Sequence, residues 1–121
     1  MNKFWTAKVW TAGALAFAIG LPSVALSAEP IEGTWLRPST NTLVKYVKRG
    51  SQFCGTVQTG AHKGKSIGCL AGSGENYKGE VIAVDEGKTY TGKASIKGDT
   101  MKLSGCVLGG LICKGEDWKR Q

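Results

Sequence analysis

The chain has 121 residues, 41% of them hydrophobic, and a formal net charge of +7, which bounds it to one small basic domain. Eighteen glycines and the lack of a long 3.6-residue repeat argue against a helical protein. Four cysteines in so short a chain indicate a disulfide framework formed in an oxidising compartment, which in turn argues against a nucleic-acid partner.

The amino terminus has the pattern of a secretory signal peptide. Lys3 and Lys8 form a basic region, and the apolar run over residues 9–24 follows them. The run is short and interrupted, which favours a cleaved signal over a membrane span, with an uncleaved anchor as the alternative.

Small residues before Glu29 predict cleavage after Ala28, with Ala25 as the second choice. Glu29 stands where a lipoprotein would carry its lipid-bearing cysteine, so we expect no lipid anchor. Residues 1–28 are therefore expected to be the signal peptide, and residues 29–121 a single soluble domain. Loss of the two early lysines lowers its formal net charge to about +5.

The rest of the chain predicts β-strands throughout. The connections after Tyr77 are short, so consecutive strands should pair as an antiparallel meander. Each strand has one apolar face, and such a meander hides its edges best by closing into a small up-and-down barrel. The first predicted strand opens with Gly33-Thr34-Trp35, and the last closes with Trp118-Lys119-Arg120. Between them the predicted strands are, in chain order, Thr42–Arg49, Phe53–Val57, Tyr77–Val84, the alternating run Tyr90–Ile96, and Thr100–Leu108.

A tight turn at Gly109-Gly110 would place Cys106 opposite Cys113, which makes a cross-strand disulfide feasible. Cys106 shares the outward side of its strand with Lys102 and Ser104, so this bridge should lie on the outer surface. Four cysteines allow three connectivities, and pairing of Cys54 with Cys69 follows by elimination. The wide cysteine spacings do not favour a metal site.

Gly33, Trp35 and Arg120 resemble a pattern of calycin-type barrels such as the lipocalins. In those proteins a Gly-x-Trp on the first strand packs beneath an arginine from near the end of the last strand. The tryptophan closes one end of the barrel, and the guanidinium stacks on its face. The alternative is that Trp35 is an ordinary core aromatic and Arg120 a solvated residue.

Longer motifs extend the resemblance. The segments Gly33-Thr34-Trp35-Leu36, Cys54-Gly55-Thr56-Val57, Gly87–Gly92 and Gly105–Cys113, followed by Trp118-Lys119-Arg120, are similar to the domain-of-unknown-function 2147 family of exported bacterial proteins, in a short form like those of alphaproteobacteria. The resemblance implies a lipocalin-like barrel and a periplasmic location, and it carries no established activity. Relatives often have a cysteine where this chain has Arg49, so a Cys54–Cys69 bridge would be a substitute pairing.

No set of residues indicates catalysis. The loop Gly60–Ser66 resembles a phosphate-binding loop, but it has three residues between its glycines where that motif requires four. His62 is the only histidine, and Glu116 and Asp117 would point to opposite faces of a strand. We therefore expect no enzyme, no cofactor and no metal.

Two non-enzymatic functions remain open. The first is a carrier of a small apolar ligand, although side chains alone could fill so small a barrel; its candidate lining residues are Val44, Tyr46, Phe53, Val57, Tyr77, Val81, Tyr90, Met101 and Leu103. The second is an envelope-interaction module whose basic face meets an anionic envelope component, with an ordinary solvated face as the alternative. Its candidate residues are Lys45, Lys48, Arg49, Lys63 and Lys65.

Overall fold

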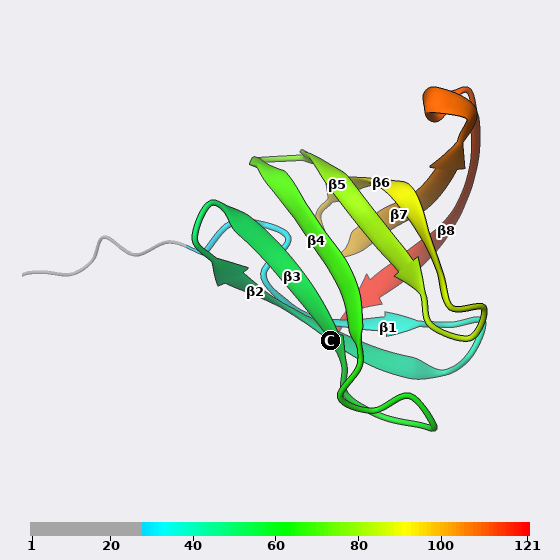
Figure 1. Ribbon diagram of the computed structural model, residues 1–121. Coiled ribbons are helices and arrows are strands. Elements are labelled where there is room, and N and C mark those ends of the chain that lie inside the picture. Colours follow the sequence, from blue (N-terminus) through cyan, green and yellow to red (C-terminus); the bar gives the residue numbers. More distant parts are fainter. Residues whose placement is uncertain (1–27) are drawn as a thin grey trace, which may run out of the picture.

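A computed structural model describes residues 28–121, and the signal-peptide prediction, including Lys3 and Lys8, falls outside them. Eight antiparallel strands close into one barrel in sequence order, with β8 returning to pair with β1 (Figure 1). The all-β, up-and-down barrel predicted from the sequence is confirmed. Its elements are β1 (Gly33–Arg37), β2 (Thr42–Arg49), β3 (Gln52–Val57), β4 (Ser66–Ser73), β5 (Asn76–Ala83), β6 (Lys88–Lys97), β7 (Thr100–Val107), the short 3-10 turn η2 (Leu108–Gly110) and β8 (Ile112–Arg120).

Strand β4 is the one element that the sequence pattern did not predict. Glycines at positions 68 and 72 replace side chains that would have shown its alternation, and both have positive φ angles, of 98° and 153°. A Cβ on Gly68 would lie 2.3 Å from the carbonyl oxygen of Glu80 on β5, and one on Gly72 would lie 2.2 Å from that of Asn76. The two strands approach so closely that only glycine fits at these positions. Among residues 28–121, no helix is both long and apolar enough to cross a membrane.

The two ends of the barrel differ. Because every connection reverses the chain, the turns alternate between ends. One end, called here the closed end, carries residues 29–32 and the turns β2–β3, β4–β5 and β6–β7. The other, called the open end, carries the connections β1–β2, β3–β4, β5–β6 and β7–β8. An apolar core occupies the barrel interior toward the closed end. Its fully or nearly fully buried side chains include Ile31, Trp35, Tyr46, Leu70, Tyr77, Ile96 and Met101.

The closed end is plugged by Trp35 and Arg120. These residues lie opposite each other in the β1–β8 ladder, and the Cζ atom of Arg120 is 4.3 Å from the centroid of the Trp35 ring. The Trp35 indole N–H donates to the carbonyl of Ile31 at 2.9 Å. The Arg120 guanidinium donates to the carbonyls of Glu32 at 3.1 Å and Pro30 at 2.6 Å, so it ties the incoming chain across the end of the barrel.

Gly33 precedes this plug, and its backbone conformation favours glycine, because its φ is 123°. Space is not the reason, since a Cβ at this position would lie 3.4 Å from an Arg120 nitrogen, an ordinary contact distance. The structure thus places the Gly-x-Trp and arginine residues in the arrangement that the calycin resemblance describes.

Both predicted disulfides are present. Cys54 bonds Cys69 across the β3–β4 ladder, and Cys106 bonds Cys113 across the β7–β8 ladder. Neither bridge belongs to the apolar cluster inside the barrel, which agrees with the outward position expected for the Cys106–Cys113 bridge. Within that bridge Cys106 is only 2% exposed, whereas Cys113 is exposed.

Candidate functional site

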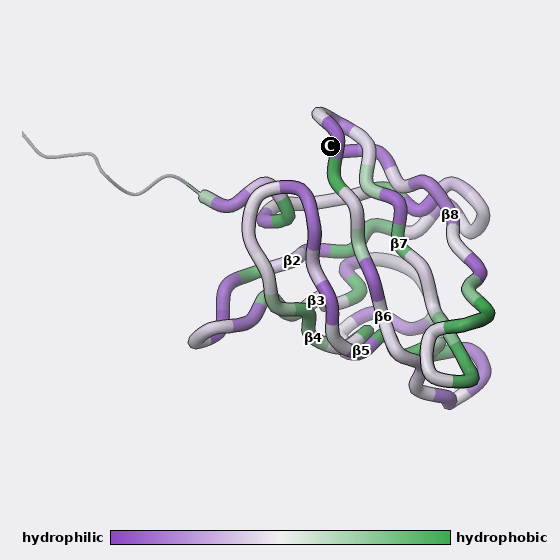
Figure 2. The backbone as a smooth tube through the Cα atoms, turned by 90° about the horizontal axis from the view of Figure 1, so that it is seen from above, coloured by the Kyte–Doolittle hydropathy of each residue, from purple (hydrophilic) through white to green (hydrophobic). Residues whose placement is uncertain are grey.

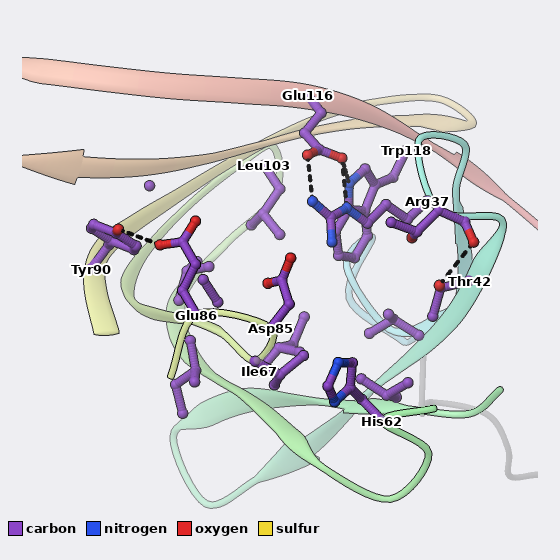
Figure 3. A pocket seen from close by; sticks show the side chains of 18 of the residues that line it. Arg37, Thr42, His62, Ile67, Asp85, Glu86, Tyr90, Leu103, Glu116 and Trp118 are labelled. Atoms are coloured by element: carbon purple, nitrogen blue, oxygen red, sulfur yellow. Dashed lines mark hydrogen bonds and ion pairs between the residues drawn. The ribbon is translucent and has the colours of Figure 1, made fainter. Parts of the chain in front are cut away.

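A cavity of about 510 Å³ opens at the open end of the barrel. Its inner wall is apolar and comes from six strands (Figure 3). The side chains that form this wall are Val44, Val57, Ile67, Val81, Leu103 and Trp118. A cavity of this size lies within the range that holds one drug-sized molecule, and an eight-stranded barrel is wide enough to enclose one.

Five of the nine residues predicted to line a cavity do so: Val44, Val57, Val81, Tyr90 and Leu103. The other four do not line this cavity, because they pack in the closed half of the barrel; they are Tyr46, Phe53, Tyr77 and Met101. Phe53 and Tyr77 meet edge to face with ring centroids 5.7 Å apart. Strand alternation places a side chain inside the barrel but does not say at what height, and height separates the two groups.

Tyr46 has a distinctive environment in that packed half. Its side chain is 1% exposed, and its hydroxyl has no hydrogen-bond partner within residues 28–121. Burial raises the pKa of this phenol well above its ordinary value of 10.0, so the hydroxyl stays neutral.

Arg37 and Glu116 form a two-pronged ion pair at the cavity wall. The Arg37 Nε donates to one carboxylate oxygen at 2.8 Å, and its Nη2 donates to the other at 2.7 Å. The hydrogen bond from Arg37 lowers the pKa of Glu116, while the same bond raises the pKa of Arg37. Both side chains are about one-third exposed, so solvent screens this pair in part.

The pair closes a seam in the barrel. Strands β1 and β8 share only two registered pairs, Trp35↔Arg120 and Leu36↔Lys119, both toward the closed end. Beyond them Glu116 also accepts from the Ser39 hydroxyl at 3.2 Å and the Trp118 indole at 3.1 Å. Side-chain hydrogen bonds therefore take over where the backbone ladder stops. With four donors on its oxygens, Glu116 is a structural acceptor and is poorly suited to act as a general base.

The mouth of the cavity carries two more carboxylates from the β5–β6 turn. Glu86 accepts a hydrogen bond from the Tyr90 hydroxyl at 2.8 Å, which raises the pKa of Tyr90. Asp85 extends into the cavity toward the guanidinium of Arg37 (Figure 3), and its charge also raises the pKa of that arginine. His62, from the β3–β4 loop, lines the opposite rim.

Sequence reasoning missed Arg37, Asp85 and His62 as cavity residues, because none lies in an apolar alternation. One signal pointed toward the site: Glu116 and Asp117 do face opposite sides, as predicted, with Asp117 exposed and Glu116 partly buried at the cavity. In residues 28–121, no three His, Cys, Asp or Glu side chains are grouped as a metal site would require.

The five candidate basic residues are all exposed and spread along neighbouring strands of the barrel. Lys48 and Arg49 lie at the closed end beside the β2–β3 turn, and Lys63 and Lys65 belong to the β3–β4 loop at the open end. Lys45 on β2 lies level with the start of β4, beside Lys65. The β3 partners of Lys48 and Lys65 are four residues apart, which corresponds to about 13 Å. A shared basic face stays a prediction.

Searches of curated proteins and of solved structures found no significant match to this chain. Residues 65–120, which begin just before β4 and extend to the end of β8, match the family model described as "Uncharacterized protein conserved in bacteria (DUF2147)". This match confirms, over residues 65–120, the resemblance to the DUF2147 family that the motifs indicate.

Proposed function

We propose that this protein is an exported, non-enzymatic binding protein of the periplasm that carries one small amphiphilic molecule in the open half of its barrel. The observation that carries the proposal is the cavity of about 510 Å³, which has an apolar wall and a polar mouth. With one end of the barrel plugged by Trp35 and Arg120, a ligand would enter this cavity from the open end. The signal-like amino terminus and the two disulfides support export.

The wall determines what the body of the ligand should be. Branched aliphatic side chains and the Trp118 ring offer dispersion contacts and no hydrogen bonds in the deepest part of the cavity. An aliphatic or aromatic body would bury its surface there at about 25 cal/mol per Å².

The mouth determines the polar end of the ligand. Glu116 uses only Nε and Nη2 of Arg37, which leaves Nη1 as a free donor within the described residues. Asp85 extends toward the guanidinium (Figure 3), and no hydrogen bond or ion pair joins Asp85 to Arg37 within residues 28–121. A ligand group that accepts from Arg37 and donates to Asp85 would satisfy both charges. A hydroxyl or a primary amide does this, whereas a carboxylate is repelled by Asp85.

Displacement of the fluorescent apolar probe N-phenylnaphthylamine tests the cavity. We expect stoichiometric binding, which Ala83→Trp weakens at least tenfold because Ala83 lines the cavity. The matched control is Ala71→Trp, since Ala71 lies exposed on the outer face of β4. Equal binding by both variants would place the probe outside the barrel and refute the proposal.

Competition against that probe tests the polar end. Decanol should compete better than decanoate, and Asp85→Asn should reduce the difference between them by removing the repulsive charge. If decanoate competes as well as decanol in the parent protein, the assignment of the polar end is wrong while the cavity remains. Native mass spectrometry of protein from its own periplasm would identify the natural ligand as an adduct that denaturation removes.

A further inference from the structure

The hairpin between β7 and β8 ends in an apolar tip, defined here as Val107, Leu108, Leu111 and Ile112. Leu111 is 85% exposed and Leu108 68%, while Val107 and Ile112 are 42% and 58% exposed. The hydropathy-coloured backbone shows this hairpin as a hydrophobic segment at the edge of the molecule (Figure 2). Nearly all the exposed large apolar side chains of the described chain are thus gathered in one place. Such a patch marks an interaction surface.

The tip projects beyond the barrel. Strand β6 accompanies β7 only as far as the pair Thr91↔Cys106, and β1 pairs with β8 only near its other end. The ribbon past the Cys106–Cys113 bridge has no neighbouring strand on either side, and it extends away from the body of the molecule (Figure 1). The disulfide closes the base of this ribbon and so holds the tip in its extended position.

The turn itself does not explain the exposed leucine at position 108. Leu108 has a φ of 54°, in the left-handed region that leucine adopts at a cost and glycine adopts freely. Two glycines with positive φ angles follow it and already make the reversal. A large apolar side chain kept in a strained and exposed position is accounted for by what it contacts outside the chain.

We infer that the tip inserts into the surface of an anionic lipid bilayer. Four apolar side chains on a narrow, convex ribbon are far fewer than the 20 to 30 residues that each partner gives to a typical protein–protein interface. They do resemble the shallow apolar anchors of peripheral membrane proteins, which basic residues assist on anionic lipid.

The charges at the open end support this partner. Lys114 follows the tip on β8 and Lys88 begins the neighbouring strand β6, while Lys63 and Lys65 lie on the opposite rim. These four lysines are exposed, and they outnumber the two carboxylates of the β5–β6 turn.

The tip and the cavity share an apolar surface. Val107 and Ile112 belong to the tip and also line the cavity. With the tip in the bilayer surface, the mouth of the barrel faces the lipid, and an amphiphile would move between membrane and cavity along apolar side chains. The docking surface stands on its own observations, and only this direction of transfer rests on the proposed function.

Co-sedimentation of the exported protein with vesicles tests the inference. We expect at least tenfold tighter binding to phosphatidylglycerol-containing vesicles than to pure phosphatidylcholine, weakened by salt. The double change Leu108→Asp with Leu111→Asp should abolish binding, whereas Val47→Asp, at an exposed apolar position on the side of β2, should leave it unchanged. Lys88→Glu with Lys114→Glu should remove the preference for the anionic lipid.

Leu108→Gly separates docking from folding, because it removes the side chain and also relieves the backbone. It should weaken vesicle binding without loss of thermal stability. Unchanged vesicle binding in the Leu108→Asp, Leu111→Asp variant would overturn the inference. The inference would also be overturned if the parent protein failed to bind vesicles and instead formed a concentration-dependent dimer that the Leu108→Asp, Leu111→Asp variant does not form. The same variant should still bind N-phenylnaphthylamine in solution, so failure of the docking surface is distinguishable from failure of the cavity.

Discussion

Replacing Glu116 with Gln tests whether side chains hold the upper part of the β1–β8 seam. The change removes the charge that Arg37 contacts through two nitrogens, at 2.8 and 2.7 Å, and puts an amide N–H₂ against one of these donors. Hydrogen bonds to charged groups contribute about 1.5–3 kcal/mol, but exposed ion pairs contribute only about 0.2–1 kcal/mol. The pair is about one-third exposed, so we expect the free energy of unfolding to fall by about 1–2 kcal/mol. Urea denaturation at neutral pH measures it.

The pH dependence gives the sign of the effect. Arg37 lowers the pKa of Glu116 below its ordinary value of 4.5, so the stabilising contribution is complete above that value. It is lost as the pH falls through the lowered pKa of the folded state, and the stability difference between parent and Glu116→Gln should shrink over the same range. Asp117→Asn is the control, because this neighbouring carboxylate is exposed on the outer face. An equal loss in the control, or a difference independent of pH, would refute the role of the seam pair.

Three further changes probe other features of the barrel. Tyr46→Phe should raise the free energy of unfolding by about 1 kcal/mol, since it removes a buried hydroxyl that lacks a hydrogen-bond partner in residues 28–121. A lower free energy of unfolding in urea denaturation would show that the hydroxyl does have a hydrogen-bond partner. Replacing Cys54 and Cys69 together by Ser should cost about 3 kcal/mol for their separation of 15 residues, measured against the parent by thermal unfolding. Gly68→Ala should lower the free energy of unfolding by about 2–5 kcal/mol, because the new Cβ would lie 2.3 Å from a backbone carbonyl oxygen. Gly74→Ala, with open space around the new Cβ, should lower it by only about 1–2 kcal/mol through backbone strain. Similar losses in the two variants would contradict this account of β4.

The sequence was sufficient where the pattern is local. Alternation and short apolar runs located five of the eight strands, and the Gly33-Thr34-Trp35 and Trp118-Lys119-Arg120 segments marked β1 and β8. The Gly109-Gly110 turn set the register that brings Cys106 opposite Cys113. Strand β4 escaped detection because its glycines, required by the close approach of β5, leave too few side chains to show a period of two.

The polar part of the site depends on long-range geometry. Arg37 and Glu116 are 79 residues apart in sequence, and they meet only because the barrel closes with a particular stagger between β1 and β8. That stagger is a property of the whole sheet rather than of any one strand, so no local pattern encodes it. The same limit applies to the height of a side chain inside the barrel, which decides that Tyr77 packs in the core while Tyr90 lines the cavity.

The short ladder between β1 and β8 has a consequence for the order of folding. Pairs such as β5–β6, with eight registered partners, close only a few residues of loop, whereas the two pairs of the β1–β8 ladder join the ends of the barrel. Closing so long a loop costs more entropy, so we expect the hairpins to form first and barrel closure to come last. In native-state hydrogen exchange, the amides of the β1–β8 ladder should then exchange through openings of lower free energy than those between β5 and β6. The partially unfolded state would be a curled sheet that is open between β1 and β8.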